Sequence, residues 1–414
     1  MSEKRCILFT AFEPSGDEHA AVVIRRLREA LPDVPVYAYG GLRMREAGAR
    51  VLEVTTGGAT MGLSSLGRVR EMLGLRRRFR SWLEENPVAV HVPTDSPAAN
   101  WWFCKAVKRL CPGSRVVHFV APQLWAWGEW RVRRLKRWSD LVLCVLPFEE
   151  GWFRERGVEA RFVGHPMFEG QESLDTGGQA ASATQPLSET RAASATQADA
   201  STEHEQDAHA TIALLPGSRP GEVDANWPLM SEVFRRLRER LGSLEGVVAA
   251  LDEGTESRLR EMTGSWPEGV RVETGNLGAV VERSDVVLAA SGTVTLHVAR
   301  YGKPMVTLYK VGMWEWNLVG RWVLRTRTFS LPNLVAAGGP TGDASRHIVK
   351  EFVPFTGGVK DVGPIVEELA SLLEDKEKAR RQVEALRSVV KQFEGHDAGR
   401  EAAEAIARLV SGSS

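Results

Sequence analysis

Along most of this 414-residue chain, short apolar runs rich in β-branched residues alternate with longer amphipathic stretches. In the first half we expect strands at 6–12, 34–39, 89–92, 116–120 and 141–146, and helices at 20–31, 66–83 and 100–110. In the second half we expect strands at 211–215, 246–251, 270–273, 285–289 and 304–308, and helices at 223–241, 256–263, 293–301 and 314–324. Continuous apolar strands separated by helices are typical of parallel sheets covered on both faces. The pattern therefore predicts an α/β fold with two Rossmann-like domains that face each other across a ligand-binding cleft.

A change of composition separates the two halves. Residues 170–210 are mostly Ala, Ser, Thr, Gln, Glu and Asp without an aromatic residue, and Ala-Ala-Ser-Ala-Thr-Gln occurs there twice. Such a stretch buries too little apolar surface to offset the entropy lost on ordering. We therefore expect an N-terminal domain over 1–169, a disordered insertion over 170–210, a C-terminal domain over 211–372 and a helical segment over 373–414. The charged helix expected at 375–409 could cross back to the N-terminal domain.

Charge and cysteine content argue against several classes of protein. Lys+Arg and Asp+Glu number 53 each, for a formal net charge of +0, so we expect no nucleic-acid partner. No apolar run approaches the roughly 18 residues of a membrane span, and the run at 6–12 is too short for a signal peptide. The four cysteines form no Cys-x-x-Cys pair, which argues against a disulfide scaffold or a zinc site. We expect a cytoplasmic protein without metal or cofactor.

The loop at 12–17 follows the first expected strand. Glu13 lies at the carboxyl edge of that strand, where a cleft would be. Ser15 can cap the next helix, and Gly16 leaves the backbone open to a ligand. The alternative for this loop is an ordinary helix cap.

The loop at 93–97 follows another expected strand. Ser96 and Pro97 make a favourable pair of N-cap and first helical residue. Asp95 is then not needed as the cap and is free to point into the cleft, where a carboxylate can accept a proton from an attacking hydroxyl. The alternative is a carboxylate that only stabilises the loop or the helix dipole.

Two strand-to-helix turns in the second half have the features of an anion site. Free backbone N–H groups, hydroxyls and an arginine at such turns suit a diphosphate, although neither turn alone is specific. The residues concerned are Gly217, Ser218, Arg219, Ser291, Gly292 and Thr293. No P-loop and no acidic metal cluster accompanies them. We interpret His118, His165 and His297 as structural histidines with satisfied ring nitrogens.

Arginine gathers with tryptophan and leucine in two segments of the first half, 63–80 and 125–137. This composition is typical of a surface that contacts anionic lipid. The alternatives are a solvated helix face with core tryptophans, or a nucleic-acid surface, for which no recognition module is present. The residues assigned to the membrane surface are Arg68, Arg76, Arg77, Trp125, Trp127 and Arg131.

The motifs, taken in order, resemble the lipid-A-disaccharide synthase family, whose members are inverting glycosyltransferases of the GT-B fold. The resemblance covers nearly the whole chain outside 170–210. In the first half it rests on Glu13-Pro14-Ser15-Gly16-Asp17, Gly40-Gly41, Met61-Gly62, Asp95-Ser96-Pro97 with Asn100, His118-Phe119-Val120-Ala121-Pro122, Trp125-Ala126-Trp127 and Gly164-His165-Pro166. In the second half it rests on Leu215-Pro216-Gly217-Ser218-Arg219, Ser291-Gly292-Thr293, Pro304-Met305-Val306 and Ser330-Leu331-Pro332-Asn333.

The resemblance implies a reaction in which UDP-2,3-diacylglucosamine donates its sugar to 2,3-diacylglucosamine-1-phosphate (lipid X), giving a β-1′,6-linked disaccharide and UDP. It implies catalysis without a metal, at the inner face of the cytoplasmic membrane. Asp95 would be the general base, and the acceptor would lie near Glu13, Ser15, Gly16 and Asn100. Arg219, the Ser291–Thr293 turn, His297 and Asn333 would bind UDP.

The chain departs from the family pattern at Phe12, Ala98, His297 and Pro354, of which His297 replaces a glutamate that grips the ribose. These departures leave two alternatives open: a GT-B protein with another UDP-sugar, such as an epimerase-like enzyme, or a non-catalytic relative that binds lipid or nucleotide. The sequence also leaves open whether the chain forms a homodimer.

Overall fold

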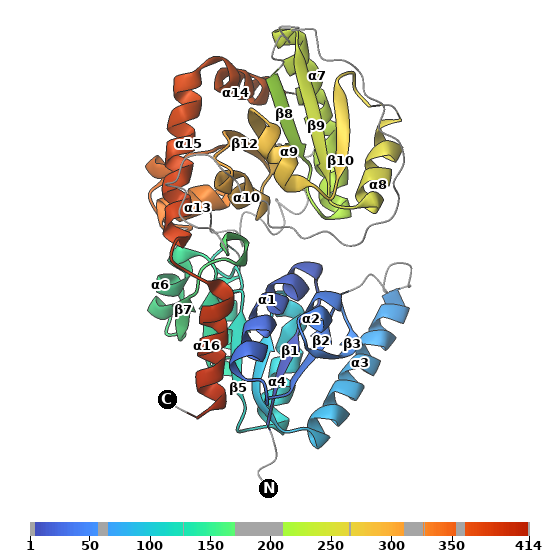
Figure 1. The fold of residues 1–414 in the computed structure, drawn as a ribbon, viewed down its shortest axis with the longest axis vertical. Coiled ribbons are helices and arrows are strands. Elements are labelled where there is room, and N and C mark those ends of the chain that lie inside the picture. The colour runs from blue at the N-terminus through green and yellow to red at the C-terminus, as the bar shows by residue number, and fades with distance from the viewer. Residues whose placement is uncertain are drawn as a thin grey trace, which may run out of the picture.

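The computed structural model describes residues 5–56, 65–126, 128–169, 210–264, 266–309, 326, 328–352 and 361–412 (Figure 1). Each half of the chain forms one parallel sheet. The first has the order β3-β2-β1-β4-β5-β6-β7. Its strands are β1 (Cys6–Thr10), β2 (Val36–Gly40), β3 (Arg50–Val54), β4 (Val88–Pro93), β5 (Arg115–Phe119), β6 (Leu141–Cys144) and β7 (Ala160–Phe162).

The second sheet has the order β10-β9-β8-β11-β12-β13. Its strands are β8 (Ala210–Leu215), β9 (Leu244–Ala250), β10 (Val270–Thr274), β11 (Val286–Ala290), β12 (Met305–Leu308) and β13 (Lys350–Phe352). In each sheet the strand order reverses beside the first strand of the domain, between β1 and β4 in the first sheet and between β8 and β11 in the second. In sheets of this topology, ligands bind at the carboxyl ends of the strands, next to the point of reversal. The expected α/β fold with two parallel sheets is therefore confirmed.

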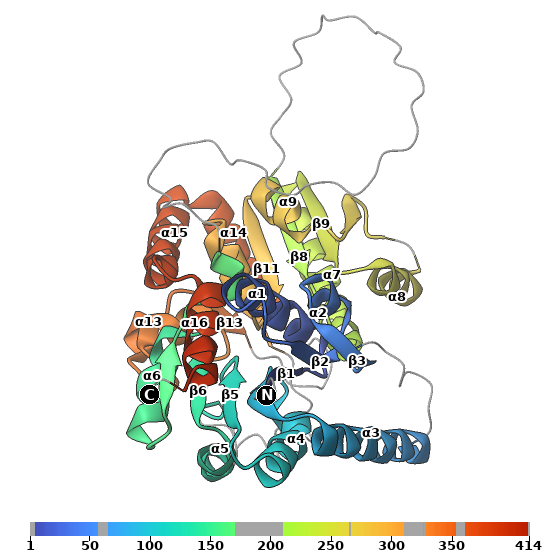
Figure 2. The same cartoon turned by 60° about the horizontal axis from the view of Figure 1, so that its bottom comes forward.

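Helices cover both faces of each sheet. Those of the first half are α1 (Pro14–Ala30), α2 (Leu42–Glu46), α3 (Ser65–Glu85), α4 (Pro97–Leu110), α5 (Val132–Trp138) and α6 (Pro147–Glu155), with 3-10 turns at Glu129–Arg131 and Pro166–Phe168. Those of the second half are α7 (Pro220–Leu241), α8 (Glu253–Thr263), α9 (Leu277–Arg283), α10 (Val294–Arg300), α13 (Leu331–Ala337) and α14 (Gly363–Glu374). In the first domain, α3, α4 and α5 line one face of the molecule (Figure 2). There Leu8 of β1 packs with Phe79 and Phe103, whereas Ile7 and Phe9 face α1 on the other side.

The end of the chain forms two helices where the sequence predicted one. They are α15 (Lys376–Val390) and α16 (Ala398–Val410), and a break at Gly395, whose φ is +80°, separates them. The first contacts α10, α13 and α14 of the second domain, and α16 contacts α1, β4 and β5 of the first. A Cβ atom on Gly399 would lie 2.7 Å from Val22 Cγ1, so the glycine allows α16 to lie close against α1.

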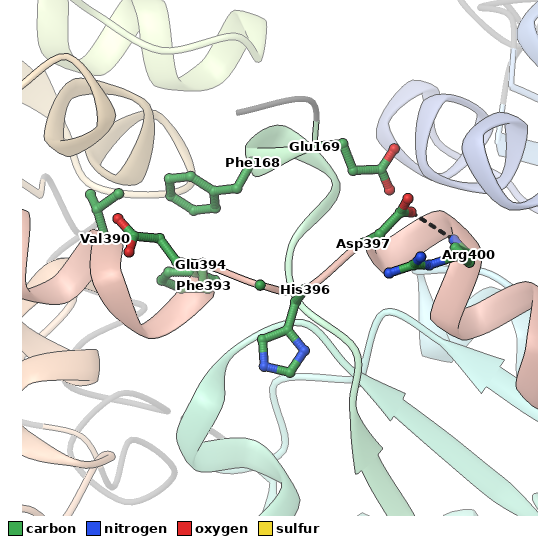
Figure 3. Close-up of a pocket in the computed structure, with 9 residues that line it drawn as sticks. Phe168, Glu169, Val390, Phe393, Glu394, His396, Asp397 and Arg400 are labelled. Carbon is green, nitrogen blue, oxygen red and sulfur yellow. Dashed lines mark hydrogen bonds between the residues drawn. The ribbon is translucent and has the colours of Figure 1, made fainter. Parts of the chain in front are cut away.

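The chain passes between the two domains at two places that lie side by side. Phe168, which follows the first sheet, stacks its ring on Phe393 of the returning segment with centroids 4.5 Å apart. The next residue, Glu169, accepts a hydrogen bond of 2.6 Å at Oε1 from the backbone N–H of Gly399. Figure 3 shows these segments around the pocket at the junction. The segment at 168–169 and the returning segment at 393–399 are therefore packed together at one junction between the domains, which we call the joint.

Three observed strands were not predicted from the sequence. Arg50–Val54 lies at the edge of its sheet with an alternating, partly exposed pattern, and Ala160–Phe162 and Lys350–Phe352 are only three residues long. Several expectations lie outside the described residues: the helix at 314–324, the motif at 61–62, Trp127, Pro354 and the insertion, except for Ala210.

Candidate active site

Asp95 lies in the loop between β4 and α4, and two donors orient its carboxylate. Oδ2 accepts a hydrogen bond of 2.8 Å from Ser15 Oγ, and Oδ1 accepts one of 2.7 Å from the backbone N–H of Ser96. The predicted capping role of Ser15 is wrong, because α1 begins at Pro14 and its N-cap residue is Glu13. Ser15 instead lies in the first turn and orients Asp95.

Glu13 connects this loop to the second domain. Its Oε1 accepts a hydrogen bond of 2.5 Å from Ser96 Oγ, and its Oε2 lies 3.0 Å from Arg219 Nη2. Ser96 occupies the N-cap position of α4 as predicted, but its hydroxyl makes no capping hydrogen bond. The contacts from Ser96 through Glu13 to Arg219 thus join the candidate acceptor side to the candidate donor side.

The backbone around Asp95 is strained and tightly packed. The φ angles of Asp95, Ser96 and Val120 are +53°, +35° and +61°, and such conformations cost non-glycine residues about 1–3 kcal/mol each. Gly16 is buried, and a Cβ atom there would lie 3.1 Å from Ala11 Cβ and 3.2 Å from the carbonyl oxygen of Thr94. The glycine therefore permits close packing of α1 on this loop, and the predicted opening of its backbone to a ligand is wrong.

Asn100 was expected to line the acceptor cleft, but its side chain is fully buried. Its Nδ2 donates to the carbonyl oxygen of Asp95 at 2.9 Å, and more weakly to those of Thr94 at 3.3 Å and Ser96 at 3.4 Å. Asn100 therefore holds the loop from below and is not available to contact the acceptor.

Two buried histidines of the first domain have lowered pKa values. Burial lowers the pKa of His118 to about 4, although the charge of Asp95 opposes the shift. Both ring nitrogens of His118 are buried without a hydrogen-bond partner among the described residues, so the prediction of a satisfied histidine is wrong there. His165 accepts a hydrogen bond of 3.2 Å from the Met167 N–H, and burial lowers its pKa to about 3.

The turn at Gly217–Arg219 leads from β8 into α7. Its amides were expected to be open to an anion, but those of Ser218 and Arg219 point at Glu222 Oε2, at 3.3 and 3.4 Å. Glu222 Oε1 also lies 3.3 Å from Arg219 Nη1. A Cβ atom on Gly217, whose φ is +121°, would lie 2.8 Å from the Glu222 side chain. A carboxylate that the sequence analysis did not single out therefore occupies this anion cradle.

The turn at Ser291–Thr293 leads from β11 into α10. Ser291 Oγ donates a hydrogen bond of 2.5 Å to the carbonyl oxygen of Phe329, Gly292 has a φ of +146°, and Thr293 is exposed. His297 is half-buried on α10, and burial lowers its pKa to about 4. Thr293 is therefore the side chain of this turn that is open to a ligand.

Asn333 was expected to contact UDP, but it is fully buried and holds α13 to β13. Its Nδ2 donates to the Val349 carbonyl oxygen at 2.8 Å and to Glu351 Oε1 at 2.7 Å. Its Oδ1 accepts hydrogen bonds of 2.8 Å from the N–H groups of Ile348 and Val349. These contacts use all four hydrogen-bonding positions of the amide, so the expected role of Asn333 in UDP binding stays a prediction.

The expected membrane surface is only partly exposed. Trp125 is 3% exposed, and its Nε1 donates to the buried carboxyl of Glu149 at 2.9 Å, so its assignment to the surface is wrong. Trp130 is 62% exposed, and the Arg131 guanidinium lies 5.3 Å from its ring centroid. On α3, Arg77 is exposed, whereas Arg76 is half-buried over the Trp102 ring. The side chain of Arg68 lies outside the described part of the chain.

The part of the chain that the structure describes has neither a metal-binding cluster nor a membrane-spanning helix. Within it, no three His, Cys, Asp or Glu side chains are grouped so that they could hold a metal ion. Among the same residues, no helix is both long enough and apolar enough to cross a membrane.

Two parallel-sheet domains, with a charged contact between the carboxyl edges of their strands, define the class of protein by its fold, which is the GT-B fold. A kitacinnamycin glycotransferase shares the fold with a TM-score of 0.55 at 14% identity, over 98% of this chain and 99% of that one. UDP-GlcNAc 2-epimerase from Neisseria meningitidis shares it with a TM-score of 0.53 at 10% identity, over 98% and 99%.

Sequence comparison places the chain more narrowly. The model of the lipid-A-disaccharide synthetase family matches residues 7–409. The lipid-A-disaccharide synthase of Myxococcus xanthus is 35% identical over 80% of this chain and 81% of its own length. That of Anaeromyxobacter dehalogenans strain 2CP-C is 32% identical over 92% of each. The chain belongs to the lipid-A-disaccharide synthase family.

Proposed function

We propose that this glycosyltransferase transfers 2,3-diacylglucosamine from UDP to lipid X, with the first domain binding the acceptor and the second binding the donor. The observation that carries the proposal is the contact between Glu13 and Arg219, at 3.0 Å across the domains. Asp95 lies on the same loop as Ser96, whose hydroxyl binds Glu13, and this supports a position of its carboxylate beside the donor turn.

Asp95 has the geometry of a general base. Ser15 and the Ser96 N–H hold its two oxygens in a fixed orientation, while the side chain remains partly exposed. The carboxylate would take the proton of the acceptor 6-hydroxyl as that oxygen attacks the anomeric carbon from the face opposite UDP. The new carbon–oxygen bond forms as the bond to the diphosphate breaks, so the product is the inverted β-1′,6 linkage and UDP.

Arg219 would stabilise the negative charge that develops on UDP. In the structure its side chain is 69% exposed and its partner Glu13 is 41% exposed. Exposed ion pairs of this kind contribute only about 0–1 kcal/mol. The guanidinium can therefore exchange Glu13 for a diphosphate oxygen at little cost, with Ser218 and Thr293 as further donors.

We also propose that the face formed by α3 and α5 contacts an anionic membrane surface, at the inner side of the cytoplasmic membrane. On α3, Val69 and Leu73 are each 57% exposed, and on the turn before α5 Trp130 is 62% exposed. Exposed apolar side chains among arginines are the composition that binds acidic lipid headgroups. Such a contact would give the enzyme access to two acylated substrates.

The test is turnover by the purified protein with UDP-2,3-diacylglucosamine and lipid X in detergent. We expect disaccharide and UDP, and we expect Asp95→Asn to lower turnover by about 10²–10⁴-fold while UDP still binds with its normal Kd. Wild-type protein that binds UDP without forming product would support the non-catalytic alternative. Turnover of a different UDP-sugar with no turnover of the acylated donor would reject the substrate assignment.

A further inference from the structure

A chain of buried polar side chains runs beneath the Asp95 loop. Thr10, at the end of β1, and His91, within β4, are both fully buried, as is Asn100 of α4. Thr10 Oγ1 lies 2.9 Å from His91 Nε2 and 2.6 Å from Asn100 Oδ1. Parallel strands buried on both faces are ordinarily almost continuously apolar, and a buried polar group is costly unless it is hydrogen-bonded. Two buried polar side chains on neighbouring strands here therefore need a reason.

The hydrogen-bond pattern fixes the direction of each bond. The amide of Asn100 directs Nδ2 to the loop carbonyls, so its Oδ1 can only accept, and Thr10 must donate its single hydroxyl proton to it. Thr10 Oγ1 is then left as an acceptor, so His91 must carry its proton on Nε2. His91 Nδ1 has no partner among the described residues, and burial lowers the pKa of this ring to about 3. The chain thus runs in one direction, from a neutral His91 through Thr10 to Asn100.

Asn100 is the point at which this chain reaches the backbone. Its amide donates to the Asp95 carbonyl oxygen at 2.9 Å, beneath two successive residues with φ of +53° and +35°. Non-glycine residues keep such conformations only when the surroundings impose them. Among the described residues, no hydrogen bond joins the Asp95 side chain to the side chains of Thr10 or His91, so the hydrogen-bonded route from these side chains to the loop passes through Asn100.

We propose that Thr10 and His91 are positioning residues that fix the Asn100 amide and thereby hold the Asp95 carboxylate in its reactive orientation. This inference rests on the proposed function of Asp95 as the general base. Misplacement of a reacting group by about 1 Å can lower a rate by about a hundredfold. The residues should therefore act on kcat and leave the binding of both substrates unchanged.

The experiment compares Thr10→Val, which removes the hydroxyl and keeps the shape, with Thr10→Ser, which keeps the hydroxyl. We expect Thr10→Val to lower kcat by at least about tenfold, with both KM values and the Kd for UDP within about twofold of wild type. Thr10→Ser should recover kcat to within about threefold. The matched control is Thr307→Val, because Thr307 is a buried threonine of β12 whose hydroxyl, among the residues that the structure describes, reaches only the Lys350 carbonyl oxygen, at 3.5 Å.

A second comparison tests the route of the effect. In the Asp95→Asn background, Thr10→Val should cause no further loss of residual turnover, because the group that it positions is already gone. A further loss of the same size as in the wild type would overturn the inference. So would a Thr10→Val enzyme with the kcat of Thr307→Val. Should Asp95→Asn keep full turnover, the proposed function of Asp95 fails, whatever the result at Thr10.

The His91 variants decide the matter should Thr10→Val not fold, as judged by circular dichroism and UDP binding. Glutamine places an amide donor near the position of Nε2, whereas leucine removes the donor. We expect His91→Gln to keep most of kcat and His91→Leu to lose at least about tenfold. Equal kcat values for these two variants would overturn the inference.

Discussion

Buried neutral histidines should make this protein unusually sensitive to mild acid. Burial lowers the pKa of His91 to about 3, of His118 to about 4 and of His165 to about 3, against 6.5 for an exposed ring. Since each folded pKa lies below the unfolded value, the unfolded chain binds protons that the folded protein refuses. The stability associated with these rings is therefore fully present above about pH 6.5 and is lost as the pH falls toward their folded pKa values.

The size of the effect follows from proton linkage. At about pH 5, a ring with an unfolded pKa of 6.5 that stays neutral in the fold lowers the free energy of unfolding by about 2 kcal/mol. The buried carboxyl of Glu149 acts in the opposite sense, because burial raises its pKa from 4.5 to about 7. Its protonation in the folded protein raises the free energy of unfolding by about 2 kcal/mol between pH 7.5 and pH 5. The loss of about 2 kcal/mol from a single such ring is already large beside a typical stability of about 5–15 kcal/mol.

The assay is urea unfolding, followed by tryptophan fluorescence, at about pH 7.5 and pH 5 for wild type and His118→Leu. His118 suits the test because its ring nitrogens have no hydrogen-bond partner in the described part of the chain, so leucine removes a titratable group and no bond. Relative to wild type, the variant should gain about 2 kcal/mol at pH 5 compared with pH 7.5. The control, His347→Leu, makes the same substitution at an exposed histidine. An equal difference between wild type and His118→Leu at both pH values would refute the reasoning.

Three further substitutions test the donor turn, the second domain and the joint. Gly217→Ala forces a side chain onto Glu222 at a φ of +121°, and we expect UDP to bind at least about fivefold more weakly by calorimetry; unchanged binding would show that the turn accommodates a side chain. Asn333→Leu removes the hydrogen-bond acceptor of the Ile348 and Val349 N–H groups and should lower the free energy of unfolding by about 2–4 kcal/mol in urea. A smaller loss would mean that water replaces the amide. Phe168→Ala removes the ring stacked on Phe393 and should lower the free energy of unfolding by about 3 kcal/mol. An unchanged Tm would contradict this expectation.

The fold was predictable because its central strands are short apolar runs. The strand predicted at 211–215 is observed at Ala210–Leu215, and that predicted at 270–273 at Val270–Thr274. The strands that escaped prediction lie at the edge of a sheet or are very short. Half of an edge strand faces solvent, so the apolar run that marks a strand in sequence is missing there.

The chemistry of the site was less predictable, because a motif shows which residues are present and not which partners they find. Ser15 and Ser96 were interpreted as helix caps, yet their hydroxyls bind Asp95 and Glu13. Asn333 lies in a family motif, yet its amide is used within the domain. One signal in the sequence was overlooked: His91 interrupts an otherwise apolar strand. A costly polar residue in such a place indicates a specific partner.

The contact of α16 with α1 has a consequence for how the protein is made. Buried residues of α16, among them Ala402 and Ile406, share one core with Ala20 and Ile24 of α1. The whole second domain lies between these segments in the sequence. The ribosome therefore releases the first domain with one flank of its hydrophobic interior still uncovered, and that flank closes only after residues 398–410 emerge. During synthesis, the half of the protein that is translated first is the half that is completed last.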